Sequence, residues 1–251
     1  MTPELKQALC DKLLALADDE LILAHRNSEW TGHGPILEED IAFANISQDE
    51  LGHATLWYSL LQELTGDDPD QLVFFRDACA YRNVQLVELP KGDWAFSMLR
   101  QFLFDTAELT ALLHLTGSAY TPIADAAAKI RQEEIYHLRH TRLWVKRLGL
   151  GTAESNGRMQ AALDVLWPYA QQLFVPLPQD RLLVEASYAP QAAALRPEWD
   201  SIVRPHLETS GLRIPQDETS PANGRDEHTE HLAALLAEMQ QVARYDPEAE
   251  W

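Results

Sequence analysis

Two Glu-x-x-His steps, Glu50/His53 and Glu134/His137, lie where a long amphipathic helix would place its apolar face. An apolar face normally excludes carboxylates, because a buried charge without a partner is costly, and a bound cation is one way to offset that cost. Carboxylates and imidazoles together are ligands for iron and related transition metals. The chemistry that these residues indicate is therefore metal binding inside a helical protein.

A lone glutamate lies on the same kind of apolar face in the helix that precedes each step. Glu20 comes before the first step and Glu108 before the second. One glutamate from each of two helices and a Glu-x-x-His from each of two others form the di-iron carboxylate site of ferritin-like bundles. The candidate metal ligands are Glu20, Glu50, His53, Glu108, Glu134 and His137.

The positions of these residues are more informative than the motif. With 9 histidines among 251 residues, about one Glu-x-x-His pair is expected by chance. In the last of the four helices, however, the ligands continue an apolar stripe of three- and four-residue steps, which marks one helix face. This stripe consists of Ile123, Ala127, Ile130, Glu134, His137, Thr141, Trp144 and Leu148.

The spacing of the glutamates about the turns is an independent indication. Residue 35, in the Thr31–Pro35 breaker, is equidistant from Glu20 and Glu50, and residue 121, in the turn 117–122, is equidistant from Glu108 and Glu134. Antiparallel helices rise equally per residue, so each pair should reach the same height in the bundle. A shared metal site requires this.

An alternative is that each acid lies at the edge of its stripe, with its carboxylate in solvent. Charge balance favours metal, because two divalent ions would cancel four buried carboxylates and the predicted seams contain no Lys or Arg. Asp49 and Glu133 precede the two steps and are candidate acceptors for the imidazole N–H groups. They could equally be ordinary surface acids.

Nearly all of the chain is predicted to be helical, so the fold class is all-α. A four-helix bundle at about residues 3–149 and a helical extension at about 152–251 would form a single domain over 1–251. Short β-branched stretches such as 84–89 are too isolated to build a sheet. The predicted helices cover about residues 3–27, 37–65, 70–83, 93–116, 121–149, 155–174 (with a break at Pro168), 197–210 and 227–245.

The charge of the chain argues against several classes of partner. Its net charge is −19, from 20 basic and 39 acidic residues, which disfavours non-specific binding to nucleic acid or anionic membranes. Arg139, Arg142, Lys146 and Arg147 cluster toward the end of one helix. Their attraction to the helix dipole is favoured over an anion site.

Other motifs are weaker. His228 and His231 have zinc-compatible spacing but no third ligand, so surface or interface histidines are favoured. No nucleotide or flavin motif is present, and any reducing equivalents would come from a partner protein. Cys10 and Cys79 in a chain without a signal peptide indicate reduced thiols, and no run of about 18 apolar residues predicts a membrane span. A soluble, cytoplasmic protein is expected.

Nearly end to end, the chain resembles the C subunit of the bacterial multicomponent phenylacetyl-CoA epoxidase. The segments that carry the resemblance are Ser28-Glu29-Trp30-Thr31-Gly32-His33, Ala42-Phe43-Ala44-Asn45-Ile46, Tyr136-His137-Leu138-Arg139, Arg147-Leu148-Gly149-Leu150-Gly151-Thr152, His228-Thr229-Glu230-His231-Leu232, Leu236-Ala237-Glu238-Met239-Gln240 and the terminal Trp251.

This resemblance implies a ferritin-like subunit that pairs with a homologous catalytic A subunit. The complex would epoxidise the ring of phenylacetyl-CoA in phenylacetate degradation, using dioxygen and electrons from a reductase subunit. The C subunit of the family is regarded as a non-catalytic partner that has largely lost its di-iron ligands, yet all six ligand types are present here. Two hypotheses follow: a subunit with its own di-iron site, or a metal-free scaffold. Whether the chain itself catalyses a reaction is left open.

Overall fold

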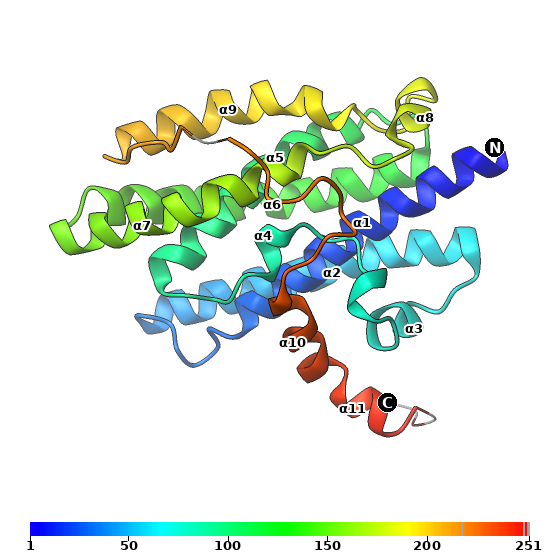
Figure 1. Cartoon of the computed structure of the whole chain (residues 1–251), viewed down its shortest axis with the longest axis horizontal. Helices are drawn as coiled ribbons and strands as arrows, with labels where there is room; N and C mark the ends of the chain where they lie inside the picture. Colours follow the sequence, from blue (N-terminus) through cyan, green and yellow to red (C-terminus); the bar gives the residue numbers. More distant parts are fainter. Residues whose placement is uncertain (217, 248, 250–251) are drawn as a thin grey trace.

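Four long helices form the centre of the computed structural model, which describes residues 1–216, 218–247 and 249. Figure 1 shows them as α1 (Pro3–Ser28), α2 (Leu37–Thr65), α5 (Trp94–Leu115) and α6 (Thr121–Gly149). The predictions for these four helices are confirmed to within two residues. No β-strand occurs among the described residues, so the all-α fold class is confirmed. Trp251 lies outside the described residues.

Local signals in the sequence set the ends of these helices. The side chain of Thr2 accepts a hydrogen bond from the backbone N–H of Leu5, and Asp93 does the same for Phe96. Gly66 ends α2 at φ 81°, a left-handed conformation that favours glycine. These caps fix ends of α1, α2 and α5, which carry four of the six candidate ligands.

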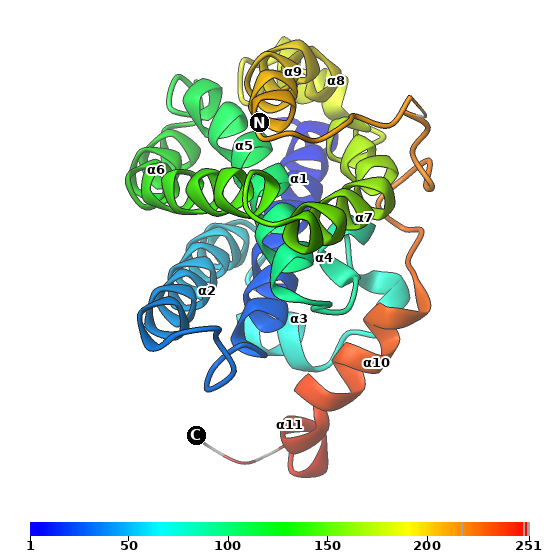
Figure 2. The same cartoon turned by 90° about the vertical axis from the view of Figure 1, so that its left-hand side faces the viewer.

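The four helices pack as two antiparallel hairpins, α1 with α2 and α5 with α6. Seen nearly end-on in Figure 2, α2 and α6 lie on one side of the molecule and α7 and α10 on the other. Trp30 and Trp94 meet edge to face with ring centroids 5.0 Å apart, and Phe43 and Trp144 complete this aromatic cluster. The cluster packs the turn after α1 against α2, α5 and α6.

The connection between the hairpins differs from the prediction. A helix was expected over residues 70–83, but α3 (Pro69–Phe74) ends early, and a 3₁₀ turn (Ala78–Ala80) and α4 (Gln85–Glu88) follow. The reason is long-range, because carboxylates of α1 take the backbone N–H groups. Asp18 accepts from Arg82 at 2.7 Å and Asp19 from Val84 at 2.7 Å. The backbone N–H groups of this segment therefore donate to side chains of α1 rather than to carbonyls of a helix of their own, and the segment is extended.

Helices after residue 150 surround the core. They are α7 (Ala153–Ala170) with a following 3₁₀ turn (Gln171–Phe174), α8 (Asp180–Glu185), α9 (Ala192–Thr209), α10 (Glu230–Met239) and α11 (Gln241–Tyr245). The regular helix continues through Pro168, where a break was predicted, and ends two residues later at the start of the 3₁₀ turn. α9 starts five residues before Pro197, earlier than the predicted start near that proline.

The last predicted helix, over 227–245, begins later than expected, at Glu230, and is divided into α10 and α11. Glu88 of α4 accepts hydrogen bonds from the backbone N–H and the hydroxyl of Thr229, both at 2.7 Å, and lies 2.5 Å from Nδ1 of His228. These contacts hold the two residues outside the helix. In Figure 1, α10 and α11 extend on the side of the core opposite to α9. Of the helices described, none combines the length and apolar character needed to cross a membrane.

Candidate metal centre

The candidate ligands lie in the interior of the four-helix core. Glu20, Glu50, His53, Glu134 and His137 are each at most 3% exposed. The alternative that these acids lie at stripe edges with their heads in solvent is therefore wrong for Glu20, Glu50 and Glu134. Burial is the expected consequence of continuing an apolar stripe on each helix.

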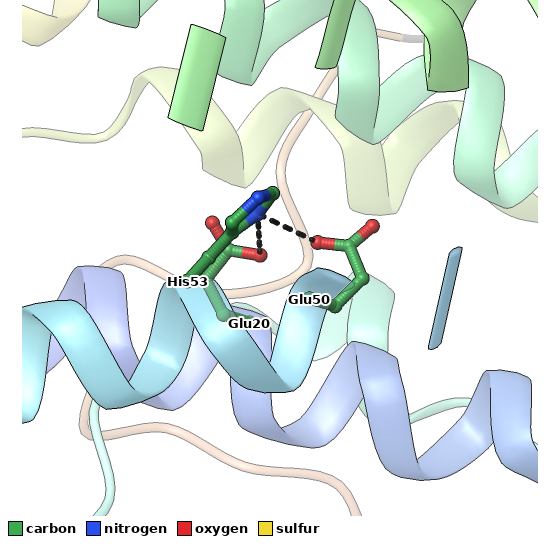
Figure 3. Close-up of side chains that lie close together, drawn as sticks. All are labelled: Glu20, Glu50 and His53. Carbon is green, nitrogen blue, oxygen red and sulfur yellow. Dashed lines mark ion pairs between the residues drawn. The ribbon is translucent and has the colours of Figure 1, made fainter. Parts of the chain in front are cut away.

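Five of the six side chains form two groups of three that share Glu50. Glu20, Glu50 and His53 offer ligand atoms within 4.8 Å of one another, and so do Glu50, Glu134 and His137. Figure 3 shows the first group, with the imidazole of His53 facing both carboxylates. Three helices contribute to these groups, α1, α2 and α6. The shared residue indicates two adjacent cation positions.

Distances within the groups are short enough for a common site. Nδ1 of His53 lies 3.7 Å from Oε2 of Glu20 and 3.6 Å from Oε2 of Glu50. Nδ1 of His137 lies 2.6 Å from Oε1 of Glu134 and 3.8 Å from Oε1 of Glu50. Both imidazoles thus direct the same ring nitrogen to the carboxylates.

Glu108 of α5 takes part differently. It lies close enough to Glu20 for the two carboxyl groups to shift each other's pKa, and burial raises the pKa of both. It belongs to neither group of three, and its residue is half-buried. The structure therefore places the sixth candidate beside the site, next to Glu20.

Several ligand atoms have no hydrogen-bonding partner. All of these atoms are buried. They are Nδ1 of His53 and one carboxylate oxygen of each acid, namely Oε2 of Glu20, Glu50, Glu108 and Glu134. Buried polar atoms without partners are costly and rare. A set of carboxylate oxygens and imidazole nitrogens fits iron or manganese, so the residues present fit a pair of such ions.

The outer ring nitrogens meet carboxylates on the opposite helix. Nε2 of His53 lies 2.8 Å from Glu133, and Nε2 of His137 lies 3.1 Å from Asp49. A carboxylate that accepts this N–H fixes the imidazole so that Nδ1 faces the metal. The prediction that Asp49 and Glu133 bind the imidazoles is confirmed. The pairing crosses between α2 and α6, because each acid serves the histidine of the other helix.

We expect Glu133→Ala to weaken metal binding by roughly 10- to 100-fold, because His53 would lose the partner that orients it. Calorimetric titration with Mn(II) would measure this change. Asp125→Ala, which removes an exposed acid from the same helix, is the matched control. Equal affinities for the two variants would contradict the orienting role.

Burial and crowding shift the pKa values of the cluster. Burial and neighbouring carboxylates raise the pKa of Glu20 and Glu134 well above the usual range. Burial also opposes ionisation of Glu50, but its neighbours Glu20, His53 and His137 lower its pKa to about 2. Burial disfavours the charged imidazoles, yet the carboxylates outweigh it and raise the pKa of His53 to about 9 and of His137 to about 12. Without metal, the cluster retains protons that ions would displace.

Sequence reasoning missed a polar network behind Glu50. The side-chain amide nitrogen of Gln101 donates to Oε1 of Glu50 and to Asp105, both at 2.6 Å. Asn27 donates to the Gln101 oxygen at 2.7 Å, and Thr141 donates to Asp105 at 3.0 Å. This chain of contacts leaves Oε2 of Glu50 free for a ligand role.

A signal for this network exists in the sequence. Gln101, Asp105 and Glu108 recur at steps of four and three, the spacing that marks one helix face. The pKa of Asp105 is well above its usual range because the side chain is buried and Glu50 is near. A search for polar residues in register with Glu108 would have found both partners.

Two further features are a small cavity next to the site and the histidine that was the weaker metal candidate. A cavity of about 60 Å³ adjoins Glu20 and Glu108 and is otherwise lined mainly by apolar side chains such as Leu16 and Phe104. His228, the weaker zinc candidate, lies against Glu88 and the carbonyl of Tyr81. Among the described residues it belongs to no group that could hold a metal ion.

Comparison with known proteins gives a consistent result. The model of a family described as phenylacetic acid catabolic protein matches residues 1–251. The C subunit of the 1,2-phenylacetyl-CoA epoxidase of Escherichia coli K12 is 38% identical over 240 residues, which cover 95% of this chain and 97% of that protein. The A subunit of the same epoxidase is 25% identical over 160 residues, covering 64% of this chain and 52% of that protein.

Proposed function

We propose that this chain, which belongs to the phenylacetic acid catabolic protein family, is the C-type subunit of a cytoplasmic phenylacetyl-CoA epoxidase complex. It would pack against and stabilise a homologous, catalytic A-type subunit, and a reductase subunit would supply electrons to the complex. The similarity to the C subunit over 95% of the chain is the observation that carries this proposal. The weaker similarity to the A subunit supports pairing between two related helical subunits.

The proposal includes a ferritin-like di-iron site in this chain. Glu20, Glu50, Glu108 and Glu134 would hold the ions through their carboxylates, and His53 and His137 would hold them through their imidazoles. Support comes from the two ligand groups that share Glu50 and from the unpartnered buried oxygens. When bound, a pair of ferrous ions would supply the capacity to reduce dioxygen.

The residues around the site would assist in three ways. Asp49 and Glu133 hold the imidazoles with Nδ1 inward. Gln101 holds Oε1 of Glu50 and leaves its other oxygen free. Packing of the core around these groups excludes water, which strengthens each electrostatic contact inside it. The cavity beside Glu20 and Glu108 leaves room for a molecule as small as dioxygen.

A metal-free scaffold is the second candidate. It is favoured by the segment after α6, which carries none of the six ligands but adds α7 to α11 around the core. The raised pKa values of Glu20 and Glu134 show how the core could accommodate its acids without ions, by keeping them protonated. In this case the chain would act only through its contacts with the A-type partner.

Metal analysis of the chain purified alone from iron-replete cells distinguishes the two candidates. We expect about two ions per chain, and a content near zero would leave only the scaffold. Co-purification with the A-type subunit of the same organism tests assembly separately. If the two subunits fail to associate, the proposed place in the complex is wrong whatever the metal content.

A further inference from the structure

An open groove lies between α5, α6 and α9, away from the ligand groups. Its volume is about 580 Å³. Leu109 of α5 and Leu138 of α6 line it, together with Ile135, Leu143 and the aliphatic and basic side chains of α6. Leu138 belongs to the buried core and Leu109 packs against it, whereas Ile135 and Leu143 face outward and contribute neither to the core nor to the candidate metal site.

Three cations on α6 line this groove without an acidic partner. Among the residues that the structure describes, Arg139, Arg142 and Lys146 form no ion pair, whereas Arg26, Arg76 and most arginines after residue 150 do. The three recur at steps of three and four, so they share a helix face and repel one another. The three together make a local positive patch on a chain whose net charge is −19.

The helix dipole accounts for only part of this cluster. Lys146 and Arg147 lie in the last turn of α6, where the dipole favours cations. Arg139 and Arg142 precede that turn, and the effect falls off within a single turn. The dipole interpretation is therefore insufficient for these two arginines, and another source of negative charge would have to compensate them.

Large apolar side chains near these cations are exposed to solvent. Of the groove residues, Leu143 is 63% exposed and Ile135 41%, and Tyr136, the residue after Ile135 in α6, is 69% exposed. Arginine, tyrosine and exposed aliphatic groups together are typical of protein interfaces, in which a few such residues carry most of the binding energy. With most of Leu143 in water, the groove is too open to enclose a small ligand, which favours a protein surface as its occupant.

We propose that this groove is the docking surface for the A-type subunit, which would place an acidic and partly apolar surface against it. The inference rests on the proposed function and adds the location of the contact. Charge complementarity is the main argument, because an acidic partner would be repelled by most of this chain and attracted to the groove. A second copy of the chain is disfavoured, since a two-fold contact would face arginines with arginines.

A charge-reversal experiment tests the proposal. The variant Arg139→Glu/Arg142→Glu is compared with Lys129→Glu/Arg213→Glu, which makes the same change in net charge at exposed positions outside the groove. Affinity for the A-type subunit of the same organism would be measured by biolayer interferometry at low and high salt. We expect the groove variant to bind roughly tenfold or more weakly and the control to bind like the natural chain. Leu143→Asp should weaken binding without reversing a cation.

Each outcome separates the groove from the broader function. If the natural chain does not bind the A-type subunit, both proposals are wrong. Binding that is normal in the natural chain and equal in both charge-reversal variants, with unchanged thermal unfolding, would overturn the groove alone. In a third outcome, the free chain binds phenylacetyl-CoA, only the groove variant loses this binding, and the affinity between the two subunits is normal. The groove would then be a ligand site, and the docking proposal would be wrong.

Discussion

Replacing Glu50 with alanine should remove metal from both positions, whereas Glu20→Ala should retain about one ion per chain. Glu50 belongs to both groups of candidate ligands, and Glu20 belongs to one. Without Glu50, each position keeps only two of its three grouped ligands, and the residue shared by the two ions is lost. The expected result is therefore a loss of both ions from a single substitution.

The two variants also differ in what surrounds the change. Oε1 of Glu50 accepts a hydrogen bond from the Gln101 amide. Alanine at position 50 removes this acceptor and leaves Gln101 with only its contacts to Asn27 and Asp105. Removing Glu20 leaves this network intact. The remaining ligand group, Glu50 with Glu134 and His137, should still bind one ion.

Elemental analysis of the purified variants would measure these contents. Glu63→Ala, which removes an exposed glutamate near the end of the same helix as Glu50, should keep about two ions per chain. Far-UV circular dichroism verifies that each variant is folded. Two ions in folded Glu50→Ala, or none in Glu20→Ala, would contradict the assignment of Glu50 as the shared ligand.

The helices and the five grouped ligands could be predicted because their signals are local. Each apolar stripe repeats at helical spacing, and Thr2, Asp93 and Gly66 fix helix ends within a few residues of themselves. Equal distances from the turns then place Glu20 level with Glu50, and the structure brings them together. Periodicity and breakers therefore contain most of the information about the core.

What could not be predicted depends on contacts between distant residues. Asp18 and Asp19 hold the segment after α3 out of helix, and Arg225 pairs with Asp19 across 206 positions of the sequence. The crossed pairing of Asp49 with His137 likewise needs two helices side by side. No spacing within a single helix encodes these partners.

The stability of the metal-free chain should fall as the pH rises from about 5 to about 9. The pKa of Glu20, Glu134 and Asp105 is well above the usual range, so the folded state keeps protons that the unfolded chain has released. The pKa of His53 is raised to about 9 and that of His137 to about 12, so the stability that they add below their ordinary pKa is lost as the pH rises. All five groups act in the same direction.

Glu50 acts outside this range. Its pKa is lowered to about 2, so the stability that it contributes is present above its ordinary pKa and is lost only at strongly acidic pH. Thermal unfolding in a chelating buffer at several pH values would measure the trend. Stability that stays constant or rises over this range would contradict the protonated cluster.

Metal should reverse this trend, because ions bind the deprotonated ligands and displace the retained protons. At a free Mn(II) concentration about a thousandfold above the dissociation constant, binding adds about 4 kcal/mol to the free energy of unfolding. For a chain of this size that raises Tm by roughly 10 °C. We expect a larger rise at pH near 8 than near 6, where protons compete with the ions.

Glu134→Gln is the informative variant for both halves of this prediction. Its amide has nearly the shape of the carboxyl group but neither ionises nor provides an anionic ligand. Stability without metal should therefore depend less on pH than in the natural chain, and added Mn(II) should raise Tm much less. Glu63→Gln should change neither measurement, since that residue is exposed. A metal-dependent rise that is independent of pH would mean that the ions bind outside the proton-retaining cluster.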